Sequence, residues 1–133
     1  MVFRFLEHTA DILFEAEGKD LKEALEEAAH AIVHATATNV KKKEKFEIKE
    51  TAPNIEEAVV GVLQKLLAEA EIKSLLPADL DVKEVMEKAD KITIKAIGWA
   101  GEGEQKTIVK GVTYGMLKVE RNKTCKIRVL LDV

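Results

Sequence analysis

The sequence contains a single cysteine, Cys125, so no disulfide bond can form within the chain. It has no apolar run approaching the ~20 residues that a membrane-spanning helix needs, and no basic and then apolar leader at its start. We therefore expect a cytoplasmic protein without membrane contact. Excess positive charge is also missing: the formal net charge is -3, which gives no overall attraction to the phosphate backbone of a nucleic acid.

Proline and glycine are scarce as well, with two and seven residues respectively, and no repeat or low-complexity tract interrupts the chain. Hydrophobic residues make up 47% of the 133 positions, which is enough for one core of ordinary size. We therefore expect a single domain over residues 1–133.

Two segments have the apolar spacing of amphipathic helices. The first, "KDLKEALEEAAHAIVHATA", follows Gly18; Asp20 is its predicted N-cap, and Glu23 completes a capping box. The second opens at Pro53 and Asn54 and carries one broad apolar stripe from Ile55 onward. Both helices need a sheet to cover their apolar faces.

The remaining segments alternate apolar and polar residues with a period of two, which predicts strands. Two strands precede the first helix, the lysine-rich "KKKEKFEIKE" lies between the helices as an edge strand, and four strands follow the second helix. This order predicts an α+β domain of two layers, with two helices packed on a largely antiparallel or mixed sheet.

The last predicted strand, "CKIRVLLDV", brings the first chemistry. Its alternation places Cys125 on the apolar face and Asp132 on the other, and the α-carboxylate of Val133 is expected one residue from the Asp132 side chain. Neighbouring carboxylates repel unless a cation joins them, and oxygen donors suit Ca²⁺ or Mg²⁺. Asp11 occupies a similar outward position before its own strand. If the two strands were neighbours, three carboxylates would converge.

Five strings in this order resemble the archease family, a group of small protein cofactors of the tRNA-splicing RNA ligase. They are "HTAD" at 8–11, "EGKDLKEALEEAA" at 17–29, "GE" at 101–102, "KGVTY" at 110–114 and the terminal "LLDV". Each string alone is weakly specific, but together they extend over nearly the whole chain.

The resemblance implies an accessory protein, not an enzyme, that binds a divalent cation and helps the ligase attach GMP from GTP to its own histidine, so that it turns over many times. It implies that Asp11, Asp132 and Val133 hold the metal, with Ca²⁺ expected first and Mg²⁺ or Mn²⁺ as alternatives. Lys110 would assist at phosphate, and His8 would support the site. GTP and RNA would be contacted through the ligase complex.

The chain departs from the family pattern in two places. Leu13 stands where a small residue often follows the "TADI" stretch, and Gly115 replaces the histidine that follows "TY" in the family. The second change removes any role of that imidazole.

Each candidate also has a purely structural explanation. Asp11 and His8 would equally well be polar residues of a turn. Asp132 and Val133 would be an ordinary chain end, and Lys110 would be a solvent-exposed strand lysine.

Three further motifs are discounted. His30 and His34 have the spacing of zinc ligands but no "HExxH" glutamate, and we expect both to face solvent. The stretch "GWAGEGEQ" fails the phosphate-loop patterns and is expected to be a mobile loop, and "KKKEK" at 41–45 is expected to be a solvated edge.

Two other functional classes remain open. A metal at Asp11 and Asp132 would activate water in a phosphoesterase, and an exposed apolar surface would hold clients in a general chaperone or scaffold.

Overall fold

Seven strands and two helices make up the computed structural model, which describes residues 2–7 and 11–133. The predicted order of two strands, a helix, a strand, a helix and four strands is confirmed. The elements are β1 (Val2–Leu6), β2 (Ile12–Gly18), α1 (Leu21–Thr36), β3 (Ala37–Ala52), α2 (Ile55–Ile72), β4 (Leu76–Lys88), β5 (Lys91–Gln105), β6 (Gly111–Arg121) and β7 (Cys125–Asp132).

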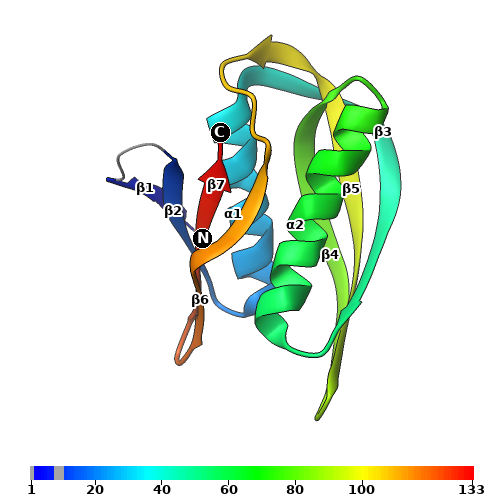
Figure 1. Cartoon of the computed structure of the whole chain (residues 1–133). Helices are drawn as coiled ribbons and strands as arrows, with labels where there is room; N and C mark the ends of the chain where they lie inside the picture. The colour runs from blue at the N-terminus through cyan, green and yellow to red at the C-terminus, as the bar shows by residue number, and fades with distance from the viewer. Residues whose placement is uncertain (1, 8–10) are drawn as a thin grey trace.

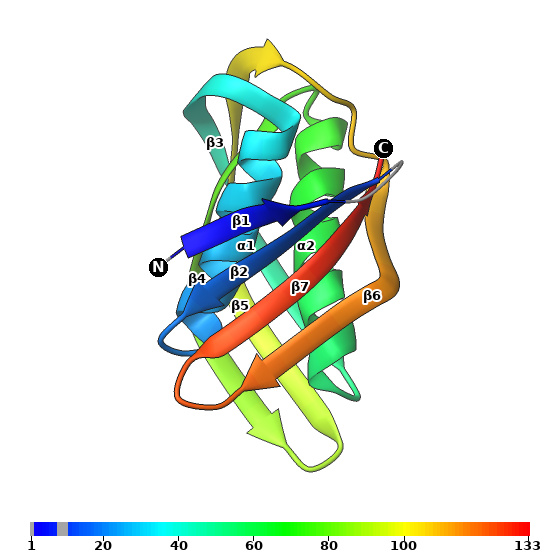
Figure 2. The same ribbon diagram turned by 90° about the vertical axis from the view of Figure 1, so that its left-hand side faces the viewer.

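The strands form two antiparallel sheets, one of order β1-β2-β7-β6 and one of order β3-β5-β4. Both helices lie between the sheets (Figure 1), and Figure 2 shows the four-stranded sheet in front of them. The predicted α+β class, with two helices packed on antiparallel strands, is confirmed. Where we expected a single sheet, the structure has one on each side of the helix pair.

The helices can lie between two sheets because each is apolar over a wide arc. At 3.6 residues per turn, the buried residues of α1 form two adjoining stripes. One stripe consists of small side chains, those of Ala24, Ala28, Ala31 and Ala35. The other consists of larger side chains, those of Leu21, Leu25 and Ile32. As a result α1 packs against both β2 and β4, and α2 against both β3 and β6.

Both helices begin where the sequence predicts. The carboxylate of Asp20 accepts a hydrogen bond from the backbone N–H of Glu23 at 2.9 Å, and the amide oxygen of Asn54 accepts one from the N–H of Glu57 at 2.9 Å. Each cap satisfies a backbone donor that the first helical turn leaves unpaired. None of the helices in the described residues is both long and apolar enough to span a membrane.

The glycine-rich stretch "GWAGEGEQ" is not a loop, so that expectation was wrong. It forms the end of β5, which pairs with β3 on one side and with β4 on the other. A Cβ atom on Gly101 would lie 1.8 Å from the backbone oxygen of Lys41, and one on Gly98 would lie 2.5 Å from the ring of Phe46. These glycines therefore serve close packing between strands rather than mobility.

An ion pair joins the two sheets at their hairpins. Arg121, at the end of β6, donates to both carboxylate oxygens of Glu87 in β4, at 2.6 and 2.8 Å. Hydrogen bonding to this guanidinium holds the pKa of Glu87 below its ordinary value. A two-point contact of this kind fixes orientation as well as distance.

Substituting Gly101 by alanine should destabilise the protein by about 1–3 kcal/mol, because the new methyl group meets the backbone of β3 and the strands must separate. Gly115→Ala is the matched control. Its new Cβ atom would lie no closer than 3.6 Å to another atom, so a change within about 0.5 kcal/mol is expected. Urea denaturation measures both, and equal stability of the two variants would contradict the close packing of β5 against β3.

Candidate functional site

Asp11 and Asp132 lie at the same end of the four-stranded sheet. The last pair at this end of the β2–β7 ladder is Ile12 opposite Leu131. Asp11 directly precedes Ile12 and Asp132 directly follows Leu131, so the backbone brings the two aspartates to neighbouring positions at this end of the ladder. Opposite residues of antiparallel strands have Cα atoms about 4.5–5.5 Å apart, which lets two carboxylates reach a common point. The condition that the sequence left open, that these two strands are neighbours, is met.

The alternation predicted for β7 is confirmed. Cys125, Ile127 and Leu131 are buried against the helices, while Asp132 is exposed. Asp11 is partly buried. Within the described residues, neither aspartate side chain has a hydrogen bond or an ion pair, so no described group neutralises their negative charge.

Lys110 joins the same region through its backbone. Its N–H donates to the carbonyl oxygen of Asp132 at 2.7 Å, and Gly111 is paired with Asp132 as the first residue of β6. The Lys110 side chain is exposed, and no residue in the described part of the chain forms an ion pair with it. The fold thus brings together the backbones of three candidates from separate parts of the sequence, Asp11, Lys110 and Asp132.

The other two candidates differ in what the structure says of them. Val133 follows Asp132 directly and is partly buried, whereas His8 lies outside the described residues. Over residues 2–7 and 11–133, no three His, Cys, Asp or Glu side chains cluster in a way suited to a metal ion. Asp11 and Asp132 supply two donors, and a third protein donor would have to be of another kind, such as a main-chain oxygen of Val133.

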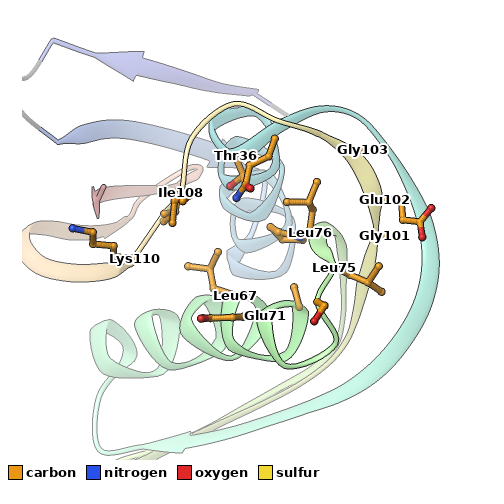
Figure 3. Close-up of a pocket in the computed structure, with 15 residues that line it drawn as sticks. Thr36, Leu67, Glu71, Leu75, Leu76, Gly101, Glu102, Gly103, Ile108 and Lys110 are labelled. Carbon is orange, nitrogen blue, oxygen red and sulfur yellow. The ribbon is translucent and has the colours of Figure 1, made fainter.

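A cleft of about 640 Å³ opens beside Lys110, between α2, the start of β4 and the end of β5 (Figure 3). Its lining includes apolar Leu67 and Leu76, and Ile108 lies on it with 69% of its surface exposed. The segment 106–110 is fixed at its start, because the N–H groups of residues 106 and 107 both donate to the carbonyl oxygen of Thr36. Because Lys110 is one of the residues that line the cleft, a molecule bound there would lie within reach of it.

An irregularity in β6 lies close to the aspartates and was not predicted. Thr113 is opposite Leu130, and the next pair is Lys118 opposite Arg128, so residues 114–117 bulge out of the ladder. The buried hydroxyl oxygen of Thr113 has no hydrogen-bond partner among the described residues. Thr113 shares the outer face of the sheet with Asp132, and its only signal in the sequence was its place in "KGVTY".

Gly115, which stands where the resemblance led us to expect a histidine, belongs to this bulge. A Cβ atom added there would lie 3.6 Å from the Thr113 hydroxyl oxygen, in ordinary contact. Gly115 thus lies next to the Thr113 hydroxyl, which lacks a hydrogen-bond partner in the described part of the chain.

The histidines with zinc-like spacing have different partners. His30 Nε2 lies 2.9 Å from Asp79 Oδ1, whereas the ring of His34, an exposed residue, lies 5.1 Å from that of Phe3. Lys42 binds the other oxygen of Asp79 at 2.7 Å and lies over the ring of Trp99. Sequence reasoning missed this cluster, because its members come from α1, β3, β4 and β5.

The cluster shifts the pKa of Asp79. Partial burial alone would raise this pKa, but the contacts with Lys42, with the N–H of Leu80 and with His30 together outweigh it, and the pKa lies below its ordinary value. Asp79 is therefore a carboxylate tied into the fold, not a spare ligand.

Two helices between two antiparallel sheets, with acidic groups and a lysine at one end, define a small α+β domain that presents its chemistry at its surface. Residues 3–133 match the Archease protein family, and the chain belongs to that family.

Individual relatives agree with this assignment over nearly their full lengths. The chain is 32% identical to the protein archease of Methanosarcina acetivorans, over 98% of this chain and 95% of that one. It is 36% identical to the protein archease of Pyrococcus abyssi, over 86% and 85%. The solution structure of Methanobacterium thermoautotrophicum protein 1598 covers 98% of each chain with a TM-score of 0.81 at 27% identity. The crystal structure of an archease and possible chaperone from Thermotoga maritima, at 23% identity and a TM-score of 0.64, has the same fold.

The lowered pKa of Asp79 predicts how its contribution to stability depends on pH. The folded state favours the carboxylate, so this contribution is complete above the unfolded pKa of about 4 and is lost as the pH falls through the lower folded value. The difference in unfolding free energy between the parent and Asp79→Asn should be constant above about pH 5 and should shrink below pH 4. Urea denaturation at each pH measures it. Lys42→Gln should reduce the same pH dependence, and parallel curves for parent and Asp79→Asn would contradict the ionic role of Asp79.

Proposed function

We propose that this protein is a metal-binding accessory protein that activates the tRNA-splicing RNA ligase, by promoting its guanylylation with GTP and so allowing multiple turnover. Membership of the archease family supports a protein partner. The observation that carries the proposal is the end of the β2–β7 ladder, where Asp11 and Asp132 stand side by side and Lys110 is bonded through its backbone to Asp132.

The donor atoms at this end fit a hard divalent cation. Asp11 and Asp132 offer carboxylate oxygens that no protein group neutralises within the described residues, and Val133 would add a further oxygen. An all-oxygen set suits Ca²⁺ first and Mg²⁺ or Mn²⁺ next. When bound, the cation would supply positive charge that holds the two carboxylates together. The strands themselves already bring the two aspartates to adjacent positions.

Lys110 is the group that we assign to phosphate. Its ammonium is exposed and unpaired in the described part of the chain, and it extends from a segment whose backbone is fixed to Asp132 and to Thr36. An ammonium group is a strongly hydrated point charge that suits phosphate oxygens. At an interface with the ligase, it would offset the negative charge of the triphosphate while the ligase histidine takes the GMP.

The proposal places the chemistry in the ligase, with GTP and RNA reached through the complex. Two side chains that otherwise suit catalysis are occupied or inaccessible. Cys125 is buried, and burial raises the pKa of its thiol, which disfavours the nucleophilic thiolate. His30 is held against Asp79 at the edge of the other sheet.

Asp11→Asn and Asp132→Asn should each weaken Ca²⁺ binding by at least about tenfold, because each removes a negatively charged ligand. Calorimetric titration of the purified protein with CaCl₂ measures this. Asp90→Asn, in the exposed β4–β5 turn, is the matched control and should bind as the parent does. Circular dichroism should show an unchanged fold, since neither aspartate belongs to the core.

Parental affinity in both variants would move the metal site elsewhere.

Lys110→Ala should lower the rate of GMP transfer to the ligase by about 100-fold while leaving Ca²⁺ binding unchanged. Labelled GTP and the ligase of the same organism report the transfer. Lys106→Ala removes another exposed lysine of the same segment and serves as the control. An unchanged rate in Lys110→Ala would remove Lys110 from the mechanism.

The same preparation separates the other two functional classes. Metal-dependent turnover of a phosphoester without ligase would favour a phosphoesterase. Suppression of client aggregation without stimulation of the ligase would favour a chaperone.

A further inference from the structure

Four lysines gather on the outer face of the three-stranded sheet, close to the β4–β5 hairpin. Lys49 of β3 stands directly opposite Lys95 of β5, and Lys88 of β4 stands directly opposite Lys91 of β5. Like charges that face one another across antiparallel strands destabilise a sheet. The sequence therefore accepts two unfavourable pairs in one small area.

A row of hydroxyl groups separates the two lysine pairs. Thr51 stands opposite Thr93, and their hydroxyl oxygens are 3.1 Å apart, so one hydroxyl donates to the other and the second keeps a free hydrogen. The four lysines, the two threonines and Met86 line a hollow of about 160 Å³, which we call the lysine hollow. The free hydroxyl hydrogen adds a neutral donor to four cationic ones.

The fold does little to neutralise this charge. Among the described residues, Lys49, Lys88 and Lys91 form no ion pair, and Lys95 approaches only Glu84, at 3.8 Å. Elsewhere on the same strands, Lys42 has a carboxylate partner at 2.7 Å and Lys43 has one at 2.6 Å. A basic hollow in which three of four lysines have no ion pair among the described residues, in a chain of net charge -3, is explained by an anion from outside.

We propose that the lysine hollow binds the phosphodiester backbone of a nucleic-acid strand. Lysine is a point charge suited to phosphate, whereas planar two-point recognition of carboxylates uses arginine, which the hollow lacks. The two lysine pairs and the threonine pair between them follow one another along β5. Because residues 91 and 95 are about 13 Å apart along the strand, the donors suit several successive phosphates better than a single one. This direct contact goes beyond the proposed function, in which RNA is reached through the ligase.

Binding at the hollow is independent of base sequence. It offers ammonium and hydroxyl donors and the half-exposed Met86, with 41% of its surface accessible, but no aromatic ring for bases to stack on. The contact holds a strand by its backbone, and its strength falls steeply with salt.

Fluorescence anisotropy with a labelled single-stranded RNA 12-mer, in EDTA and without ligase, tests the proposal. The double variant Lys49→Gln/Lys91→Gln removes one lysine from each pair and should weaken binding at least about fivefold. It should also lower the slope of log affinity against log salt by about 1.4. The control Lys41→Gln/Lys45→Gln removes two exposed lysines of β3 that do not line the hollow and should stay within about twofold of the parent.

A second variant separates binding from folding. Lys49→Glu places an opposite charge across from Lys95, so without RNA it should raise the melting temperature by about 1–4 °C, and it should lose RNA binding. Asp11→Asn should bind the RNA as the parent does, which keeps this test apart from that of the metal site.

Four results would overturn the proposal. Two concern the RNA itself: the parent does not bind it, or the control variant Lys41→Gln/Lys45→Gln loses as much affinity as Lys49→Gln/Lys91→Gln. The other two concern competing ligands: polyglutamate binds the parent as tightly as the RNA does, or inorganic phosphate raises the melting temperature of the parent as much as the RNA does at the same phosphate concentration. The last two would assign the hollow to acidic protein segments and to a single anion, respectively.

Discussion

The antiparallel pairing of β2 with β7 is the interaction on which the rest of the structure depends. These are the two central strands of the four-stranded sheet, and β1 and β6 are each held by one of them. Their inner faces bury Phe14, Ile127 and Val129 against the helices. Pairing β2 with β7 closes the long chain segment between Gly18 and Cys125 into a loop. The entropy cost of this closure grows only slowly with loop length, and the buried apolar surface offsets it. The same pairing brings Asp11 beside Asp132 and, through the β6–β7 ladder, fixes Lys110 next to them.

Charges of opposite sign are separated on this small protein. Asp11 and Asp132, which have no ion pair among the described residues, adjoin the end of the β2–β7 ladder, whereas the lysine hollow is lined by residues of the three-stranded sheet close to the β4–β5 turn. Figure 1 shows the C-terminus that follows β7 far from the β4–β5 hairpin, which lies at the bottom of the view. The net charge of -3 does not reveal this pattern. A modest average charge excludes strong long-range attraction to nucleic acid, but it says nothing about a local basic surface.

The features that depend on local sequence were predictable, and those that depend on distant strands were not. The caps at Asp20 and Asn54 and the outward position of Asp132 follow from spacing alone, and all are present in the structure. The approach of Asp11 to Asp132 needed a pairing that no spacing encodes. A glycine in a sequence indicates either a flexible backbone or a site where two backbones pack closely. At Gly101 only the position of β3 shows that the second explanation holds. The Thr113 hydroxyl has no hydrogen-bond partner among the described residues, and this too depends on the register of β6 on β7, which spacing does not encode.

The β2–β7 pairing also sets the order of events during biosynthesis. Of the elements described, β7 is the last to leave the ribosome, so β2 waits without its central partner while α1, β3 and the following elements are made. At about 5–20 residues per second, this delay lasts about 5–20 seconds. The three-stranded sheet, whose strands all precede β6, can form in that interval. The two aspartates can meet only after β7 has emerged, so this end of the four-stranded sheet is completed after the other described elements have been made.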